Sequence, residues 1–155
     1  MKPRFNYSYK GMQCRVCLVR EGKGESIKIN NPKDIYALVK DELVNADREM
    51  LISIMLTTSN HLIGVEVVSI GSLNSTQTTP REVFKSAILS NANSIVLCHN
   101  HPSGVLSPSN CDYFITDEMV KAGRLLGILV VDHIIVSHAG YKSLRESDDD
   151  QQISW

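Results

Sequence analysis

The stretch SIVLCHNHPSGVLSPSNCD, residues 94–112, contains an apolar run, two histidines, a helix-capping turn and a carboxylate. Its first five residues, 94–98, are typical of a strand that is covered on both faces. His99 and His101 follow at the carboxyl end of this strand, where active sites lie in open α/β sheets. Because side chains alternate along a strand, both imidazoles project to the same face. The stretch therefore predicts an α/β fold with a chemical site at one edge of its sheet.

Asp112 completes a candidate metal site with these histidines. The helix that we expect to begin at Ser107-Pro108 carries Asp112 in its first turn, on the core-facing stripe. This stripe consists of Asp112, Ile115, Met119, Ala122 and Leu126. An inward carboxylate is costly unless a charge or hydrogen-bond donors compensate it. Two imidazoles and a carboxylate fill three positions of tetrahedral zinc and leave the fourth for water, as catalytic sites require. Stabilisation of Asp112 by the helix dipole is the alternative, but it does not explain the inward placement.

Composition predicts one soluble domain. The chain has 155 residues, 43% hydrophobic and 21% charged, with a net charge of −1. No apolar run approaches the roughly 20 residues that span a bilayer, and the N-terminus lacks the apolar centre of a signal peptide. Four cysteines are too few for a disulfide scaffold, so we expect a cytoplasmic protein. The net charge provides no broad field for nucleic acid, although a local basic patch can form from Lys2, Arg4, Lys10, Arg15 and Arg20.

Three segments are expected along the chain. Residues 1–30 are an N-terminal extension with a strand near residues 13–19, residues 31–145 are the α/β domain, and residues 146–155 are a polar tail. The pair Cys14 and Cys17 lies in the expected strand, where positions i and i+3 face opposite ways. It lacks a second CxxC to complete a zinc site, so we interpret it as structural.

Hydrophobic periodicity predicts the elements of the domain. Asn31-Pro32 begins a first helix, whose stripe is Ile35, Leu38, Val39 and Leu43. The sequence Thr79–Glu82 has the pattern of a capping box and begins a second helix to about Asn91, with the stripe Val83, Phe84, Ala87 and Ile88. Gly127 ends the third helix. The strands are a hairpin of residues 49–58 and 62–70, the histidine strand, and residues 129–131 and 133–136, as two strands or one bent strand.

The site motif resembles that of a known family. The pattern HxHP, six residues, Ser, two residues, Asp is that of the JAB/MPN (JAMM) metalloproteases, and its positions here are His99, His101, Pro102, Ser109 and Asp112. The sequences PREVF before the site, HNHPSG within it and LLGILVVDHIIV after it are similar to the bacterial RadC-like branch. The similarity covers residues 31–145.

This resemblance implies a single-domain, cytidine-deaminase-like (JAB/MPN) three-layer α/β sandwich with a mixed central sheet. It further implies Zn²⁺ bound by His99, His101 and Asp112, which activates a water to hydrolyse a peptide or isopeptide bond. Ser109 is the candidate donor to the developing oxyanion. Asn100 departs from the Ser or Thr of the eukaryotic deubiquitinase branch, which weakens the case for ubiquitin as the substrate.

A general base is also required. The family takes it from a glutamate near the start of the strand beside the histidine strand, and Glu49 fits this position. Glu66, in mid-strand, and Glu82, in the expected capping box, are the alternatives. The remaining histidines have no partner at ligand spacing, and we expect surface or structural roles for His61, His133 and His138. Cys98 alternates away from the face of His99 and is expected in the core.

Three functions stay open at this point. The first is a zinc peptidase with a peptide or protein substrate. The second is a hydrolase of another bond, such as a phosphodiester. The third is a non-enzymatic module in DNA repair or mobile-element biology, the role by which RadC-like proteins have often been labelled. The complete Glu–His–His–Asp set favours an enzyme. The net charge and the lack of a helix-hairpin-helix segment, which full-length RadC-like proteins usually carry, make DNA a less favoured partner.

Overall fold

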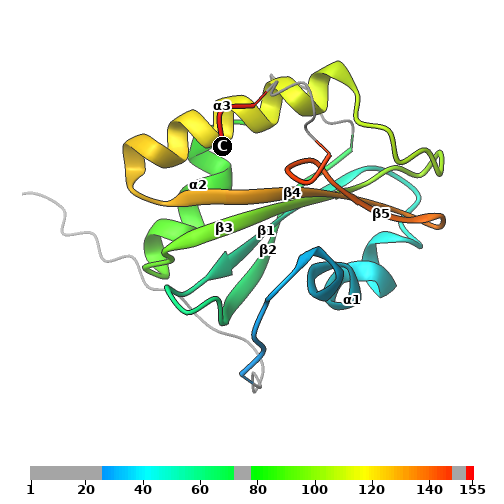
Figure 1. Ribbon diagram of the computed structural model, residues 1–155. Coiled ribbons are helices and arrows are strands. Elements are labelled where there is room, and N and C mark those ends of the chain that lie inside the picture. Colours follow the sequence, from blue (N-terminus) through cyan, green and yellow to red (C-terminus); the bar gives the residue numbers. More distant parts are fainter. Residues whose placement is uncertain (1–25, 72–77, 148–152) are drawn as a thin grey trace, which may run out of the picture.

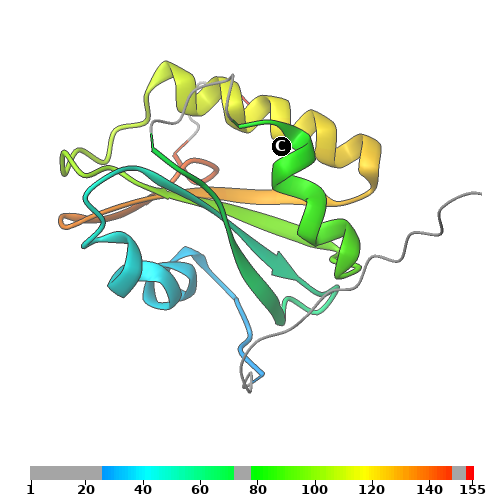
Figure 2. The ribbon, with the colours of Figure 1, turned by 180° about the vertical axis from the view of Figure 1, so that it is seen from behind.

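A five-stranded mixed sheet forms the middle layer of the fold, with helices on both of its faces (Figures 1 and 2). The computed structural model describes residues 26–71, 78–147 and 153–155. The described elements are α1 (Pro32–Leu43), β1 (Met50–Leu56), β2 (Leu62–Ile70), α2 (Pro80–Leu89), β3 (Ser94–Asn100), α3 (Asn110–Leu126), β4 (Leu129–Ser137) and β5 (Gly140–Ser143). Helix α1 covers one face of the sheet, and α2 and α3 cover the other (Figure 1). This arrangement confirms the expected three-layer α/β sandwich.

The topology explains where the site lies. The strand order is β2-β1-β3-β4-β5. β1 is antiparallel to β2 and β3, β3 is parallel to β4, and β4 is antiparallel to β5. All seven residues of β3 are buried, as expected for a strand covered on both faces. The first residues of β1 therefore lie beside the last residues of β3, and Leu51 pairs with His99.

Several local predictions are confirmed. The side chain of Asn31 caps α1 by accepting a hydrogen bond from the amide of Asp34, and Ile35, Val39 and Leu43 are buried. β1 and β2 form the expected hairpin. Of the two alternatives left open for the residues after Gly127, the single strand is correct, and it is β4. It contains one extra residue, because Ile95 pairs with Val130 whereas Val96 pairs with Asp132.

Other predictions about helix ends were wrong. Helix α3 begins at Asn110 and not at Ser107-Pro108, because the hydroxyl of Ser109 accepts a hydrogen bond from the amide of Asp112 and thereby caps the helix. Thr79 caps α2 without a side-chain hydrogen bond. Glu82 pairs with Lys85 at 3.1 Å, so the predicted capping box is absent.

The predicted apolar stripes of α2 and α3 include residues near the helix C-termini that do not face the core. Ile88 is 51% exposed and Leu126 is 48% exposed, so neither belongs to the core-facing stripe of its helix. Both lie in the last turn of their helix. The short strand β5 was not predicted, because its four residues carry no alternating apolar pattern.

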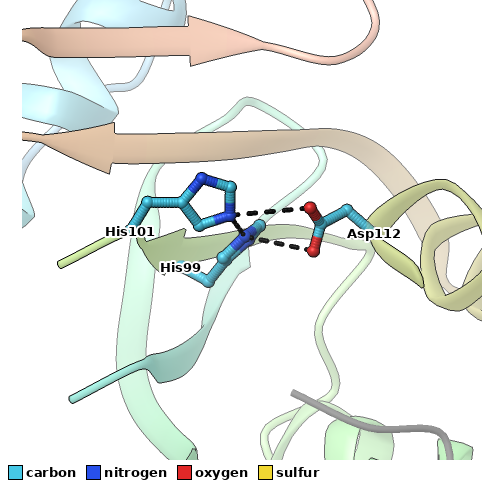
Figure 3. A group of neighbouring side chains, drawn as sticks. All are labelled: His99, His101 and Asp112. Carbon is cyan, nitrogen blue, oxygen red and sulfur yellow. Dashed lines mark hydrogen bonds and ion pairs between the residues drawn. The ribbon is translucent and has the colours of Figure 1, made fainter. Parts of the chain in front are cut away.

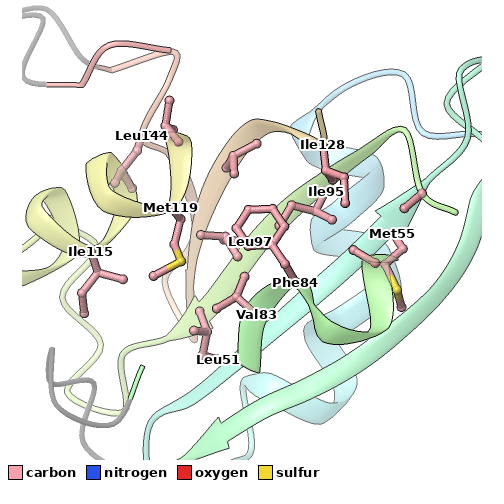
Figure 4. Packing of buried hydrophobic residues seen from close by; sticks show 14 of the residues in the cluster. Leu51, Met55, Val83, Phe84, Ile95, Leu97, Ile115, Met119, Ile128 and Leu144 are labelled. Atoms are coloured by element: carbon pink, nitrogen blue, oxygen red, sulfur yellow. The ribbon is translucent and has the colours of Figure 1, made fainter. Parts of the chain in front are cut away.

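Two hydrophobic cores lie on opposite faces of the sheet. Under α2 and α3, the larger core includes Phe84, Leu97 and Met119 (Figure 4). The second core lies under α1 and includes Cys98, which is fully buried as predicted. Ile153 belongs to the larger core although it lies in the segment expected to be a polar tail.

Some expectations fall outside the described residues. These are the strand near residues 13–19, the pair Cys14 and Cys17, and the basic residues of the N-terminal segment. Lys28, at the start of the described chain, forms an isolated antiparallel bridge with His61. Among the described helices, none has the length and apolar character that crossing a membrane would require.

Candidate metal centre

The strand β3 and the helix α3 bring the three predicted ligands together. His99 is the next-to-last residue of β3. The amide of His101 donates to the carbonyl of Val136 at 2.9 Å, so the chain stays paired to β4 one residue beyond the strand. This pairing keeps both imidazoles on the same face. Asp112 is the third residue of α3, and Figure 3 shows its carboxylate pointing at both rings.

The ligand atoms converge on one point. The Nε2 atoms of His99 and His101 are 2.9 Å apart. The carboxylate oxygens of Asp112 lie 3.3 Å from Nε2 of His99 and 3.5 Å from Nε2 of His101. All three ligand atoms lie within 4.8 Å of one another. Two nitrogens and one carboxylate oxygen at this spacing form a donor set suited to a divalent metal ion.

Burial makes the charge of this cluster important. His99 is fully buried, and the side chains of Asp112 and His101 are 4% and 13% exposed. Burial raises the pKa of Asp112, but the neighbouring imidazoles of His101 and His99 outweigh it and hold this pKa well below its ordinary value. The nearby carboxylate of Asp112 raises the pKa of His101. The cluster therefore contains a carboxylate that stays ionised and favours a cation beside it.

The hydrogen bonds of His101 test whether a metal ion fits. Its Nδ1 lies 2.6 Å from the carbonyl oxygen of Val105, which can only accept, so Nδ1 carries the hydrogen. In its neutral form the ring then has a lone pair on Nε2, and this atom faces Asp112 and Nε2 of His99. Lone pairs that converge on one point beside an ionised carboxylate need a cation between them. The residues present fit a metal ion.

Glu49 and Ser109 border the same pocket. This polar pocket is lined by Glu49, His101, Ser103, Val105, Ser107, Ser109 and Asp112. Glu49 immediately precedes β1, the strand beside β3. The alternative bases Glu66 and Glu82 do not line it, and both pair instead with Lys85, at 3.7 Å and 3.1 Å. Of these three glutamates, only Glu49 lies beside the metal cluster.

The side chain of Asn100 holds the backbone on both sides of Glu49. Its Oδ1 accepts a hydrogen bond from the amide of Met50 at 2.7 Å, and its Nδ2 donates to the carbonyl of Arg48 at 3.0 Å. The amide of Gly71 donates to the carbonyl of Glu49 at 2.8 Å. Sequence reasoning treated Asn100 only as a departure from a motif and missed this contact. A prediction that β1 pairs with β3 would have placed Asn100 beside the backbone of Arg48 and Met50.

His133 is a second residue whose role the sequence did not reveal. It was expected to be surface or structural, and the structure buries it with its Nε2 only 2.7 Å from Nδ1 of His99. Its Nδ1 lies 2.6 Å from the hydroxyl of Thr116, which is buried in α3. Burial lowers the pKa of His133 well below its ordinary value. His133 thus contacts a candidate ligand without belonging to the ligand group.

The other histidines and the cysteines of the described chain lie outside the ligand group. His61 lies between β1 and β2, and Nδ1 of its ring contacts the hydroxyl of Ser59 at 3.2 Å. His138 is exposed beyond the end of β4. Burial raises the pKa of Cys111, which is next to Asp112, and of Cys98. Both cysteines are thiols at neutral pH, and neither resembles a reactive thiolate.

Comparison with known proteins gives consistent matches. A family model described as "RadC-like JAB domain" matches residues 29–149. A UPF0758 protein of Methanosarcina acetivorans is 47% identical over 119 residues, which are 77% of this chain and 52% of that protein. UPF0758 proteins of Desulfitobacterium hafniense and Clostridium tetani are 47% identical over 118 residues and 46% identical over 125 residues. These matches cover 76% and 81% of this chain, and 52% and 55% of the relatives. The chain spans about half the length of the curated relatives that it matches.

Proposed function

This chain belongs to the RadC-like JAB domain family, and we propose that it is a zinc-dependent metallohydrolase that cleaves peptide or isopeptide bonds. The observation that carries the proposal is the convergence of His99, His101 and Asp112 within 4.8 Å. Two imidazoles and one carboxylate leave a position open on tetrahedral zinc, which is the pattern of a catalytic site. When bound there, zinc supplies Lewis acidity and lowers the pKa of a coordinated water to about 7.

Glu49 is the proposed general base. Its position in the pocket that His101 and Asp112 also line supports this role. There its carboxylate takes a proton from the attacking water and passes it to the nitrogen of the leaving amine. Asn100 fixes the backbone on both sides of Glu49, so the carboxylate starts from a defined position. Preorganisation of this kind lowers the entropic cost of reaching the transition state.

Ser109 is the proposed donor to the oxyanion that forms on the substrate carbonyl. Its hydroxyl donates to the carboxylate of Asp112 at 2.8 Å in the described structure. To serve the substrate, the hydroxyl must exchange this hydrogen bond for one to the carbonyl oxygen. A single well-placed donor of this type contributes about 10²–10³ in kcat.

A search for substrates tests the proposed reaction. The zinc-loaded chain is incubated with a whole proteome, and new N-termini are mapped against the Glu49→Gln variant. Cleavage products that appear with the wild-type chain and are missing with the variant support a peptidase. If the two samples give the same N-termini while a phosphodiester is hydrolysed in a parallel assay, the reaction class is wrong.

Binding to DNA separates the proposed enzyme from the alternative role in DNA repair or mobile elements. With a net charge of −1, we propose only weak and non-specific affinity for duplex DNA, since few phosphates can be neutralised at once. Duplex and single-stranded DNA are titrated at about 150 mM salt, near physiological ionic strength. Sub-micromolar binding that persists under these conditions would favour a nucleic-acid substrate.

A further inference from the structure

We propose that Thr116 and His133 form a hydrogen-bonded relay that fixes the tautomer of His99, so that Nε2 of His99 stays unprotonated and available to a metal ion. In this role both are positioning residues, since neither touches the ligand position itself. The inference rests on the metal centre of the proposed function and is independent of which bond is cleaved.

The direction of each hydrogen bond follows from Thr116. Its hydroxyl donates its single hydrogen to the carbonyl oxygen of Asp112 at 2.5 Å. The same oxygen lies 2.6 Å from Nδ1 of His133, and with its hydrogen already used it can only accept there. Nδ1 of His133 therefore carries a hydrogen. The neutral His133 ring then has a lone pair on Nε2, which lies 2.7 Å from Nδ1 of His99. Nδ1 of His99 must be the donor in that contact.

The metal end of the relay gives the same assignment independently. A histidine binds a metal through a ring nitrogen with a lone pair, and Nε2 of His99 is the atom that faces His101 and Asp112 (Figure 3). A neutral imidazole with a lone pair on Nε2 carries its hydrogen on Nδ1. This hydrogen points at Nε2 of His133. Two arguments that start from opposite ends of the network agree on every hydrogen.

Burial makes the relay effective. His99 and Thr116 are 0% exposed and His133 is 1% exposed, so bulk water does not replace these hydrogen bonds. The relay also joins two ligands, because it runs from the backbone of Asp112 in α3 through β4 to the ring of His99 in β3. Residues that orient metal-ligating histidines in this way typically change metal affinity by 10–100-fold when they are replaced.

The tautomer of His99 can be measured directly. The metal-free chain of residues 1–155 is labelled with ¹⁵N-histidine and examined by long-range ¹H–¹⁵N correlation at about pH 8, above the ordinary pKa of imidazole. We expect the hydrogen of His99 on Nδ1 in the wild type. Thr116→Val keeps the shape of the side chain and removes the acceptor. We expect this variant to populate the Nε2-protonated form of His99 and to bind zinc about 10–100-fold more weakly in a chelator competition. Thr116→Ser keeps the hydroxyl and is expected to restore both properties.

Each outcome decides one point. A wild-type His99 protonated on Nε2 would overturn the relay, and this measurement needs no variant to fold. A Thr116→Val variant with the wild-type tautomer and zinc affinity would overturn it as well. If the wild type has the expected tautomer but binds no zinc, the proposed function fails while the assignment of the relay is supported.

Discussion

Ser109 and Asp112 are joined by three hydrogen bonds within one turn of α3. The amide and the hydroxyl of Ser109 donate to Oδ2 of Asp112 at 2.7 Å and 2.8 Å, and the amide of Asp112 donates to the hydroxyl oxygen of Ser109 at 3.2 Å. This reciprocal cap orients a candidate metal ligand through the same contacts that begin the helix. One serine therefore affects both folding and the site, and its two roles need separate tests.

Replacing Ser109 separates capping from catalysis. Ser109→Ala removes the cap and is expected to lower the free energy of unfolding by about 1 kcal/mol, whereas Ser109→Gly costs only a few tenths. Both variants lack the hydroxyl, so an oxyanion donor predicts an equal loss of about 10²–10³ in kcat. Urea unfolding and kcat on an identified substrate provide the measurements. Wild-type kcat in the glycine variant would show that Ser109 is a cap alone.

Replacing Asn100 tests how Glu49 is positioned. Asn100→Ala leaves the amide of Met50 and the carbonyl of Arg48 without their partner, which we expect to cost about 1–3 kcal/mol of stability. Movement of Glu49 is expected to lower kcat by up to about 10²-fold. Zinc content should stay unchanged, because Asn100 projects away from the face of the two histidines. Asn45→Ala, at an exposed asparagine, is the matched control. Unchanged kcat in Asn100→Ala would contradict this role.

The metal site itself predicts a stoichiometry. Protein purified without chelator is expected to contain about one zinc per chain, with ligand distances of about 2.0–2.2 Å. Elemental analysis measures the stoichiometry and X-ray absorption measures the distances. The double variant His99→Ala, His101→Ala is expected to lose the metal, since Asp112 alone cannot hold it. Full zinc retention by that variant would show that zinc binds to other residues of the chain.

Replacing Glu49 separates metal binding from hydrolysis. Glu49→Gln keeps the shape of the side chain but cannot accept a proton, so we expect normal zinc content and a loss of about 10²–10⁴ in kcat. Glu66→Gln and Glu82→Gln are the matched controls, because both glutamates contact Lys85 outside the pocket. If Glu49→Gln turned over substrate at the wild-type rate and one of the controls lost activity, the glutamate replaced in that control would be the general base.

The carboxyl of Asp132 predicts a dependence of stability on pH. Burial, the largest influence, raises its pKa above the ordinary value, although Ser143 and the amides of Arg145 and His133 donate hydrogen bonds to it. The native state therefore binds this proton more tightly than the unfolded chain. Its contribution to the free energy of unfolding is lost as pH rises from about 4 through the raised pKa.

Asp132→Asn removes this titration. The stability of the wild type relative to the variant is expected to fall across that pH range, as measured by urea unfolding at a series of pH values. A difference that stays constant with pH would show that the pKa of Asp132 is equal in the folded and unfolded states.

The sequence predicted what depends on local periodicity. Alternation along β3 and the position of Asp112 in its helix were sufficient to bring the candidate ligands together. Asn31-Pro32 was sufficient to begin α1, because a cap depends on a few adjacent residues. These features arise from short stretches of chain, whereas the three-layer arrangement was expected from the family resemblance.

Contacts between distant segments were not predictable in this way. His133 reaches His99 only because β4 lies parallel to β3, and Asn100 reaches Arg48 only because β1 lies beside β3. The predicted capping box at Thr79 failed because the side chain of Glu82 contacts Lys85. The pairing of distant strands has no signature in a single stretch of residues, whereas the ion pair of Glu82 with Lys85 is local and spans only three residues.

The extra residue in β4 decides which layer of the protein His133 belongs to. Val130 packs in the core beneath α2 and α3, and Val131 packs against the core beneath α1. Strict alternation from there would point residue 133 toward α1. The extra residue shifts the alternation of side chains by one position, so His133 and Ile135 project toward the same side as His99. Without the bulge, a β4 of the same sequence would turn its histidine to the opposite face of the sheet, away from His99.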